Sequence, residues 1–355
     1  MTEQEFQTFL RSIRPADRAA MDAAARRQAE LAKPPGSLGA LEDVSIRLAG
    51  LTGRVKNRID RCRVLVFAAD NGVTAEGVSA TPVSVTLSQS INMTRHITGM
   101  SALAAAFGDS VVVTDVGIDA DVRCPEIVDR KIRRSTGDIA REPAMTREQA
   151  ILAIETGMAL VRDAREAGFS LLATGEMGIG NTTTSSAVAA VLLGEPVERM
   201  TGRGAGLSDA GLGRKLDAIR RGISRNRPNA EDALDVLGKL GGLDIAGLCG
   251  VFLGGARYRV PIVMDGFISG VAALCAVRLC PKADAAIFAS HASSEPAARR
   301  VMEALGKRPL ITAGMHLGEG TGAVASIPLW DMALAVYQGC YSFAEGGIAP
   351  YTPQC

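Results

Sequence analysis

Two glycine-rich stretches of this sequence carry carboxylates where they could do chemistry. Residues 175–186, GEMGIGNTTTSS, combine three glycines with Glu176 and a run of hydroxyl side chains. Residues 317–322, LGEGTG, place Glu319 between two glycines. Because its neighbours have no side chains to shield it, Glu319 is open to close approach by a substrate and is the candidate general base. The alternative is a solvated loop glutamate without a catalytic role.

The first stretch is typical of a phosphate-binding turn. It follows the strand-like run SLLAT and precedes the helix-like run AVAAVLL. A strand, a turn and a helix N-terminus leave backbone N–H groups unpaired, and the helix dipole favours an anion beside them. We expect Gly178 and Gly180 to adopt backbone angles that other residues avoid. The alternative is an ordinary strand-to-helix turn capped by Thr183 or Thr184.

Two further stretches supply groups that suit the rest of a nucleotide and a flat base. TGRGAGL at residues 201–207 is followed by Lys215, which either reaches a phosphate as a point charge or is a surface lysine of a helix. GVSATPVSVTLSQS at residues 77–90 provides hydroxyl, amide and proline side chains, a lining that suits a small heterocycle, although hydroxyl-rich turns are common. Glu176 would repel a phosphate, so its place in the loop favours contact with a ribose hydroxyl.

The composition excludes several classes of protein. The chain has 355 residues, of which 47% are hydrophobic, and 39 Lys and Arg balance 38 Asp and Glu. No basic block or basic-aromatic patch is present, so we expect no nucleic-acid partner. The first residues contain no apolar signal core, and no apolar run reaches the roughly 18 to 20 residues that span a bilayer. We therefore expect a cytoplasmic protein that does not contact membranes.

The cysteines and histidines indicate neither a disulfide framework nor a metal site. Seven cysteines are an odd number, and no pair has CxxC spacing. The three histidines, His96, His291 and His316, lie far apart in the sequence. We therefore expect reduced core cysteines, no metal and no cofactor.

Six short apolar runs alternate with helix-length segments from residue 63 onward. Each run leads to glycine, acidic or hydroxyl residues; the runs are residues 64–69, 111–114, 170–174, 260–263, 285–289 and 309–312. This alternation predicts an α/β fold with a doubly wound, mostly parallel, six-stranded sheet of the Rossmann-like kind. Ligands of such sheets bind beyond the carboxyl ends of the strands, where we expect these clusters to converge.

Helical patterns precede, link and follow the strands. Residues 4–32 predict one or two helices interrupted near Pro15, and the turn KPPGSLG allows Ser37 to cap the next helix. Thr146 and Gln149 predict a capping box for a helix that Gly168 can end. The chain after residue 322 is mostly helix-like.

One motif is misleading. Gly318, Gly320 and Ala323 fit the relaxed GxGxxA dinucleotide pattern after a predicted strand. In a dinucleotide-binding fold a second strand follows the motif and ends, about 20 residues later, in an acidic residue that binds a ribose hydroxyl. No such strand is predicted here. The loop at residues 175–180 reads GxxGxG, which is a different spacing. An oxidoreductase is therefore disfavoured.

Eight segments together resemble the nicotinate-nucleotide:dimethylbenzimidazole phosphoribosyltransferase family of cobamide lower-ligand biosynthesis. In chain order they are KPPGSLG, ADNGVTAEGVSATP, GEMGIGNTT, TGRGAGL with Arg214-Lys215, GGLDIAGLCG, MDGFISG, SHASSEP and LGEGTGA, spanning Lys33 to Ala323. GEMGIGNTT and LGEGTGA are highly specific as a pair.

The resemblance implies transfer of 5-phosphoribosyl from nicotinate mononucleotide to 5,6-dimethylbenzimidazole with inversion. The products are α-ribazole 5′-phosphate and nicotinate, as in cobalamin biosynthesis. It also implies a homodimer whose subunit has a catalytic α/β domain at residues 61–322. A small helical domain would combine residues 1–60 with the C-terminal segment 323–355.

The resemblance assigns the role of general base to Glu319. Together with the loops described above, it gives the residues expected to bind phosphate and ribose as Glu176, Gly178, Ile179, Gly180, Asn181, Thr182 and Lys215. The residues expected to bind the base are Ser79, Thr81, Pro82, Gln89 and Leu317.

Two positions depart from the family's pattern, because Asn71 and Ala298 stand where the family often has histidine. They could alter the base pocket or the dimer contact, and they bear on which base is accepted more than on the reaction. Two alternatives stay open: a related transferase that prefers adenine, another benzimidazole or a phenol, and a non-catalytic nucleotide-binding protein. The intact LGEGTGA segment with Glu319 argues against the second.

Overall fold

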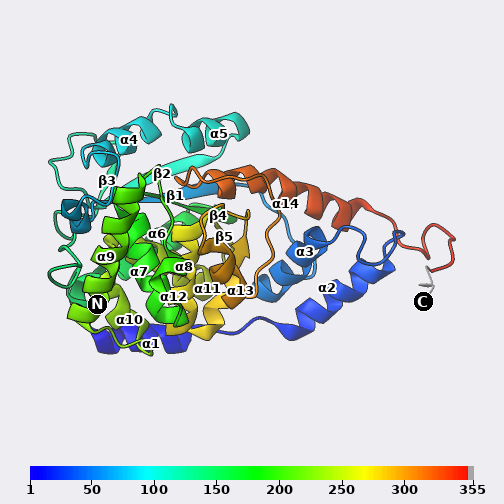
Figure 1. Ribbon diagram of the computed structural model, residues 1–355. Coiled ribbons are helices and arrows are strands. Elements are labelled where there is room, and N and C mark those ends of the chain that lie inside the picture. Colours follow the sequence, from blue (N-terminus) through cyan, green and yellow to red (C-terminus); the bar gives the residue numbers. More distant parts are fainter. Residues whose placement is uncertain (351–355) are drawn as a thin grey trace.

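A computed structural model describes residues 1–350 as a parallel sheet between two layers of helices (Figure 1). The strands are β1 (Cys62–Ala69), β2 (Ser110–Gly117), β3 (Val128–Asp129), β4 (Leu171–Met177), β5 (Ile262–Met264) and β6 (Ile287–Ala289). They lie in the order β3-β2-β1-β4-β5-β6, and every pairing is parallel. The chain winds outward in one direction from β1 and in the other from β4, which confirms the doubly wound α/β fold.

Five of the six predicted strands are confirmed, and the one at residues 309–312 is wrong. Of those residues only Ile311 pairs, in an isolated bridge with His291. Pro309 lacks the N–H that a ladder needs. The sixth strand is β3, which pairs with Thr114 and Asp115 of β2. Two residues are too few to form an apolar run, so no sequence pattern marks this strand.

Helices cover both faces of the sheet (Figure 1). On one face α4 (Val85–Thr94) and α5 (Gly99–Phe107) contact β2, and α14 (Thr321–Gly339) contacts β4. On the other face α11 (Leu243–Tyr258) and α12 (Phe267–Leu279) contact the central strands, and α6 (Arg147–Glu166) packs on α11. The remaining helices are α1 (Glu3–Ser12), α2 (Arg18–Glu30), α3 (Ala40–Thr52), η1 (Gly72–Glu76), α7 (Asn181–Leu193), α8 (Val197–Met200), α9 (Asp209–Asn226), α10 (Ala233–Leu240), η2 (Pro281–Ala286) and α13 (Ala298–Ala304).

The predicted helix boundaries are partly confirmed. Thr146 and Gln149 form the capping box of α6, and Gly168 beyond its end has a φ of +85°. Ser37 does not cap α3, because the N-cap is Gly39 and no side chain bonds to the first turn. Ser37 lies within the preceding turn, where its N–H donates to Pro34.

Glycines allow α6 and α11 to cross in direct contact. A Cβ on Gly157 would lie 2.0 Å from the carbonyl oxygen of Gly247, and one on Gly250 would lie 2.0 Å from that of Ile154. Any side chain at these positions would push the two helices apart. Helix α11 is buried from Leu243 to Ala256 and lies under β1, β2 and β4, so this crossing is central to the core.

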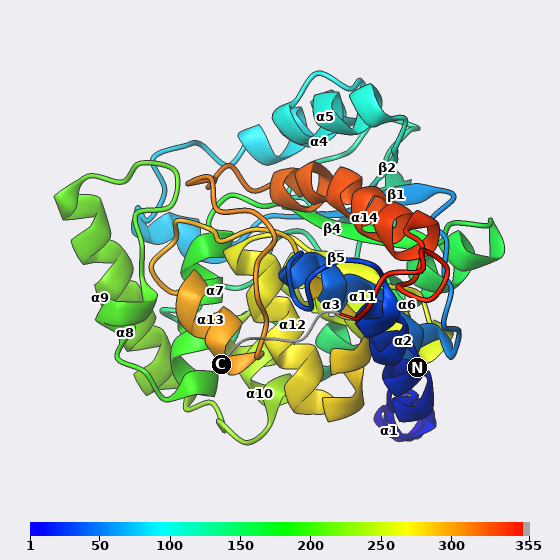
Figure 2. The same cartoon turned by 90° about the vertical axis from the view of Figure 1, so that its right-hand side faces the viewer.

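Helices from both ends of the chain share a second, smaller core. Its buried members come from α2, α3, α14 and the residue after α2, namely Ala20, Ala24, Ala49, Tyr337 and Leu31. Leu31 also forms an antiparallel bridge with Ser342. Figure 2 shows α2 and α3 beside the C-terminal part of α14. We propose that they form the small helical domain, whereas α1 buries Phe6 and Leu10 in the main core beside α6.

No helix within residues 1–350 has the length and apolar character to cross a membrane. The six cysteines in this range are free thiols, and Cys249, Cys275 and Cys280 are buried. The seventh, Cys355, lies outside the described residues.

The helix crossing generates a stability prediction. Gly250→Ala should lower the free energy of unfolding by about 3 kcal/mol, because overpacking against a backbone carbonyl forces the helices to shift. Gly213→Ala is the matched control, since Gly213 is an exposed helical glycine and a Cβ there would have no neighbouring atom within 4 Å. It should be neutral or stabilising by up to about 1 kcal/mol. Urea unfolding measures both, and equal effects would contradict the packing argument.

Candidate active site

The loops after β4, β5 and β6 meet the loop before α14 at a cavity of about 270 Å³. It lies beyond the carboxyl ends of these strands, where the sequence predicted a ligand site. The polar residues at the ends of β1 and β2, among them Asp70 and Asp115, do not line this cavity. Asp70 instead accepts the N–H of Asp119 at 2.8 Å, and Asp115 pairs with Lys131 at 2.9 Å. Convergence is therefore confirmed for β4, β5 and β6, and the longer segment after β1 adds Thr81 and Gln89 to the cavity wall.

Most of the predicted site residues line this one cavity. They are Thr81, Gln89, Glu176, Gly178, Ile179, Asn181, Thr182, Leu317 and Glu319. Ser79, Pro82, Gly180 and Lys215 are not among the lining residues. Ser79 is occupied in its own turn, where its hydroxyl accepts the N–H of Thr81 and donates to the carbonyl of Thr81.

Glu319 is held at the cavity wall and is not a solvated loop residue. Only 7% of its surface is exposed. Its Oε1 accepts a hydrogen bond from Gln89 Nε2 at 3.1 Å, and Oε2 accepts one from the backbone N–H of Met100 at 3.3 Å. Met100 lies in the first turn of α5, where the helix dipole favours a negative charge. Glu319 also has a φ of +64°, a strained conformation for a non-glycine residue that often marks functional sites.

The loop after β4 passes directly into α7. This helix begins at Asn181, earlier than the apolar run predicted, and its N-cap is Gly180 with no side-chain cap. Gly180 has a φ of +93°, as expected, whereas the expectation for Gly178 is wrong because its φ is not positive. Gly178 is required for space, since a Cβ there would lie 2.4 Å from the carbonyl oxygen of Ala69. Within residues 1–350 the N–H groups of Gly180 and Thr182 have no acceptor and are free for an anion.

Three buried carboxyl groups, those of Glu176, Asp244 and Asp265, lie close together at this loop. Asn181 Nδ2 donates to Glu176 Oε2 and, at 3.0 Å, to Asp244 Oδ2. Burial and the nearby Asp244 raise the pKa of Glu176 to about 8, and burial raises the pKa of Asp244 to about 6. Glu176 therefore carries a proton at neutral pH. Its Oε1 accepts the N–H of Glu319 at 3.3 Å, which ties the two glycine-rich loops together.

Lys215 lies behind the loop and is fully buried. Its ammonium donates to Thr182 Oγ1 at 2.9 Å and to the carbonyl of Gly202 at 3.0 Å, and burial lowers its pKa to about 8. Two of the three ammonium hydrogens are used in these bonds. The surface-lysine alternative is therefore wrong.

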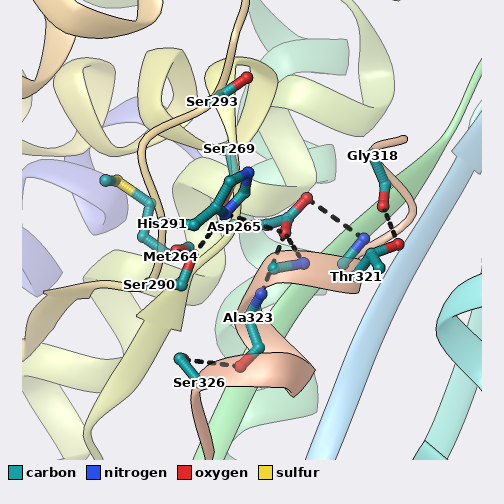
Figure 3. A network of polar contacts seen from close by, with 12 residues as sticks. Met264, Asp265, Ser269, Ser290, His291, Ser293, Gly318, Thr321, Ala323 and Ser326 are labelled. Carbon is teal, nitrogen blue, oxygen red and sulfur yellow. Dashed lines mark hydrogen bonds and ion pairs between the residues drawn. The ribbon is translucent and has the colours of Figure 1, made fainter. Parts of the chain in front are cut away.

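Asp265 is a site residue that sequence reasoning missed. Oδ1 accepts the N–H groups of Gly322 and Ala323 at 2.8 and 3.1 Å, and Oδ2 accepts that of Gly320 at 3.2 Å (Figure 3). The carboxylate thus fixes the start of α14 and, with it, Glu319. The signal was present, because the sequence places Asp265 in a polar cluster directly after a predicted strand.

The two departures from the family's pattern lie away from the cavity. Asn71 is buried, accepts a hydrogen bond from Thr184 Oγ1 at 3.2 Å and lies 3.5 Å from the carbonyl of Ile179. Ala298 is buried at the start of α13. Neither lines the cavity, so any effect of these two residues on the base pocket would be indirect. Asn71 supports the phosphate-type loop instead.

The buried proton on Glu176 predicts how stability depends on pH. The folded protein keeps this proton up to about pH 8, whereas an unfolded glutamate releases it near the ordinary pKa of 4.5. Stability must therefore fall as pH rises between these values. From pH 6 to pH 8 we expect a loss of about 2 to 3 kcal/mol in the wild type. Glu176→Gln should remove this loss, as measured by urea unfolding at each pH.

Exposed Glu231 provides the control, because Glu231→Gln should keep the wild-type slope. A wild-type stability that rises from pH 6 to pH 8 would contradict the buried proton.

Comparisons with known proteins agree with this geometry. A family model described as phosphoribosyltransferase matches residues 13–348. An enzyme of Acetivibrio thermocellus named nicotinate-nucleotide–dimethylbenzimidazole phosphoribosyltransferase is 49% identical over 98% of this chain and 99% of its own length. The enzyme of the same name from Chloroflexus aggregans is 48% identical over 95% of this chain and 96% of its own length.

Two solved structures are also similar to this chain over nearly its whole length. A crystal structure of the enzyme of this name from Thermus thermophilus has a TM-score of 0.88 and 40% identity, covering 94% of this chain and 99% of that one. A structure of CobT from the same organism has a TM-score of 0.89 and 41% identity, covering 94% of this chain and 100% of that one. The fold, the paired glycine-rich loops and these matches over nearly the whole length agree: the chain belongs to the nicotinate-nucleotide–dimethylbenzimidazole phosphoribosyltransferase family.

Proposed function

We propose that this chain transfers the 5-phosphoribosyl group of nicotinate mononucleotide to 5,6-dimethylbenzimidazole, forming α-ribazole 5′-phosphate and nicotinate for the nucleotide loop of cobalamin. One observation carries the proposal: a fixed carboxylate, Glu319, lies on the wall of the same cavity as Gly178, Ile179, Asn181 and Thr182 of the phosphate-type loop. The first suits proton removal from a base, and the second suits the phosphate of a nucleotide.

The proposed reaction is a displacement at C1′ of the ribose. One nitrogen of the benzimidazole forms a bond to C1′ while the bond from C1′ to the pyridinium nitrogen breaks. The electron pair of that bond neutralises the pyridinium, so nicotinate leaves without help from an acid. The other benzimidazole nitrogen loses its proton to Glu319. Attack from the opposite face inverts the β-linked nucleotide to the α-linked product.

Glu319 is well placed to accept that proton. Gln89 and Met100 each donate one hydrogen bond to its carboxylate, which leaves further lone pairs of both oxygens for the base. We assign Ser79, Thr81, Pro82, Gln89 and Leu317 to the base-binding side. Of these, Thr81, Gln89 and Leu317 contact the cavity directly, and Ser79 and Pro82 shape the turn that carries Thr81.

The opposite wall binds the nucleotide in this proposal. The free N–H groups of Gly180 and Thr182 and the start of α7 receive the phosphate, together with Ile179 and Asn181. Lys215 adds a positive charge from behind Thr182. Glu176 contacts the ribose, and because it is protonated at neutral pH it does not repel the phosphate. Holding both substrates in line can contribute effective molarities of order 10⁵ M or more.

We also propose a cytoplasmic homodimer with small-molecule substrates as its only other partners. Three apolar side chains on the neighbouring helices α5 and α14 support a subunit contact, since Phe107 is 58% exposed, Met332 57% and Val336 37%. Apolar side chains that gather on neighbouring helices are typical of a protein–protein contact.

Removal of the proton acceptor tests the activity. Glu319→Gln keeps the shape of the side chain and should lower kcat by about 10²- to 10⁴-fold, the usual contribution of a general base. The measurement is nicotinate release from nicotinate mononucleotide with dimethylbenzimidazole, and the anomeric form of the product is determined by NMR. Thermal unfolding of the variant should stay close to that of the wild type.

Two results would contradict the proposal. Normal turnover by Glu319→Gln would show that Glu319 is not the proton acceptor. No nicotinate release by the wild type with dimethylbenzimidazole, benzimidazole, adenine or p-cresol, while the nucleotide still binds, would favour a non-catalytic nucleotide-binding protein.

The dimer has its own test. The double variant Phe107→Glu, Met332→Glu should shift the mass measured by light scattering from dimer to monomer at micromolar concentration, because it places two charges from each subunit in the contact. Leu152→Glu changes a side chain on α6 that is 45% exposed and should leave the mass unchanged. A monomeric wild type would refute the dimer.

A further inference from the structure

Two histidines border the active-site cavity without a role in the chemistry described above, and one of them, His291, is buried. His291 follows β6, is only 5% exposed and lines the cavity. Its ring lies against the first turn of α14, where a Cβ on Gly322 would be 1.8 Å from Nδ1. Glycine at position 322 therefore makes room for the imidazole, and this packing holds the ring in one place.

The hydrogen bonds around Nδ1 decide which nitrogen carries the proton. Ser290 Oγ lies 3.0 Å from His291 Nδ1 and donates to the carbonyl oxygen of Met264 at 2.7 Å. A hydroxyl has a single hydrogen, so Ser290 Oγ must accept from His291 Nδ1–H. The carboxylate of Asp265, 3.9 Å from Nδ1, favours a hydrogen on the same nitrogen. In a neutral imidazole the other nitrogen, Nε2, is then an acceptor.

Nε2 lies on the ring edge opposite this network (Figure 3). None of the hydrogen bonds within residues 1–350 involves Nε2, and this atom is not one of the fully buried polar atoms that lack a partner. Gly266, which also lines the cavity, leaves this edge uncovered, since a Cβ there would lie 3.5 Å from Nε2. An acceptor that borders the cavity and has no protein partner is available to a ligand that supplies the donor. The arrangement therefore points to a substrate atom that carries a hydrogen.

The proposed substrates offer few such hydrogens. In nicotinate mononucleotide the phosphate and the nicotinate carboxylate are ionised acceptors, and the pyridinium nitrogen has no hydrogen. The single N–H of dimethylbenzimidazole goes to Glu319 in the mechanism above. The two ribose hydroxyls are the donors that remain. We therefore propose that His291 is a ribose-binding residue whose Nε2 accepts a hydrogen bond from the 2′- or 3′-hydroxyl of the nucleotide.

This inference rests on the proposed function and gives the ribose a contact on the β6 side of the cavity, in addition to Glu176 on the β4 side. It assigns Ser290 and Asp265 the role of positioning residues that fix the tautomer. If the proton were on Nε2 instead, the ring would offer the hydroxyl a donor in place of an acceptor, and Nδ1 would have no hydrogen to donate to Ser290 Oγ.

The test compares three nucleotides with matched variants. His291→Met removes the acceptor at similar volume, and His291→Gln keeps an acceptor oxygen. KM is measured for nicotinate mononucleotide and for its 2′-deoxy and 3′-deoxy analogues, with dimethylbenzimidazole saturating. His291→Met should raise KM for the natural nucleotide about tenfold, the usual effect of leaving one buried hydrogen-bonding group unpaired. The effect should vanish with the analogue that lacks the contacted hydroxyl, and His291→Gln should recover most of the loss.

His316→Met is the control, since His316 is the other cavity histidine and is exposed, with Nδ1 beside the carbonyl of Gly314. Its effect on KM should be the same for all three nucleotides. If His291→Met does not fold, as judged by thermal unfolding, His291→Asn replaces it, because its side chain is too short to reach the hydroxyl that Nε2 would contact, and the loss it causes must also vanish with one analogue.

Two outcomes overturn the inference: an equal KM penalty on all three nucleotides, or no penalty on any of them. Failure of the wild type to release nicotinate would instead refute the proposed function, so the two failures are distinguishable.

Discussion

The carboxylate of Asp265 is the interaction on which the active site depends. It lies directly after β5 and accepts three backbone N–H groups from the first turn of α14, a helix on the opposite face of the sheet from α12. These donors have no partner inside their own helix, and the charge lies at the positive end of the helix dipole. This contact holds the Gly318–Gly320 turn, in which Glu319 has its strained backbone conformation, against the end of the sheet.

A second constraint is the crowding of acids beneath the phosphate-type loop. Glu176 and Asp244 share one amide group of Asn181, and Asp265 is buried nearby. Buried like charges cannot all remain ionised, so a proton stays on Glu176. Glu176 is therefore neutral, and a neutral carboxyl group can lie beside a phosphate without repelling it. The sequence alone made Glu176 look unsuited to that position, and its burial explains why it is tolerated.

The glycines of the two loops serve different physical needs. Gly180 and Gly320 provide left-handed backbone conformations that start α7 and α14. Gly178 provides space beside the carbonyl of Ala69, and Gly322 provides space for the ring of His291. The loops are therefore adapted both to their own turns and to neighbours that lie far away in the sequence.

The sequence by itself determined the fold class, five of the strands and both glycine-rich loops with their carboxylates. Local information was sufficient there, because apolar runs, capping residues and glycines act over a few neighbouring positions. It missed β3, which is too short to leave a pattern, and it wrongly indicated a strand at residues 309–312. Only the tertiary structure decided that Lys215 is buried behind Thr182, that Asp265 holds α14, and that Asn71 lies away from the cavity. Those outcomes depend on which loops the parallel sheet brings together and on how deeply each charge is buried, and neither is encoded in the spacing of residues along the chain.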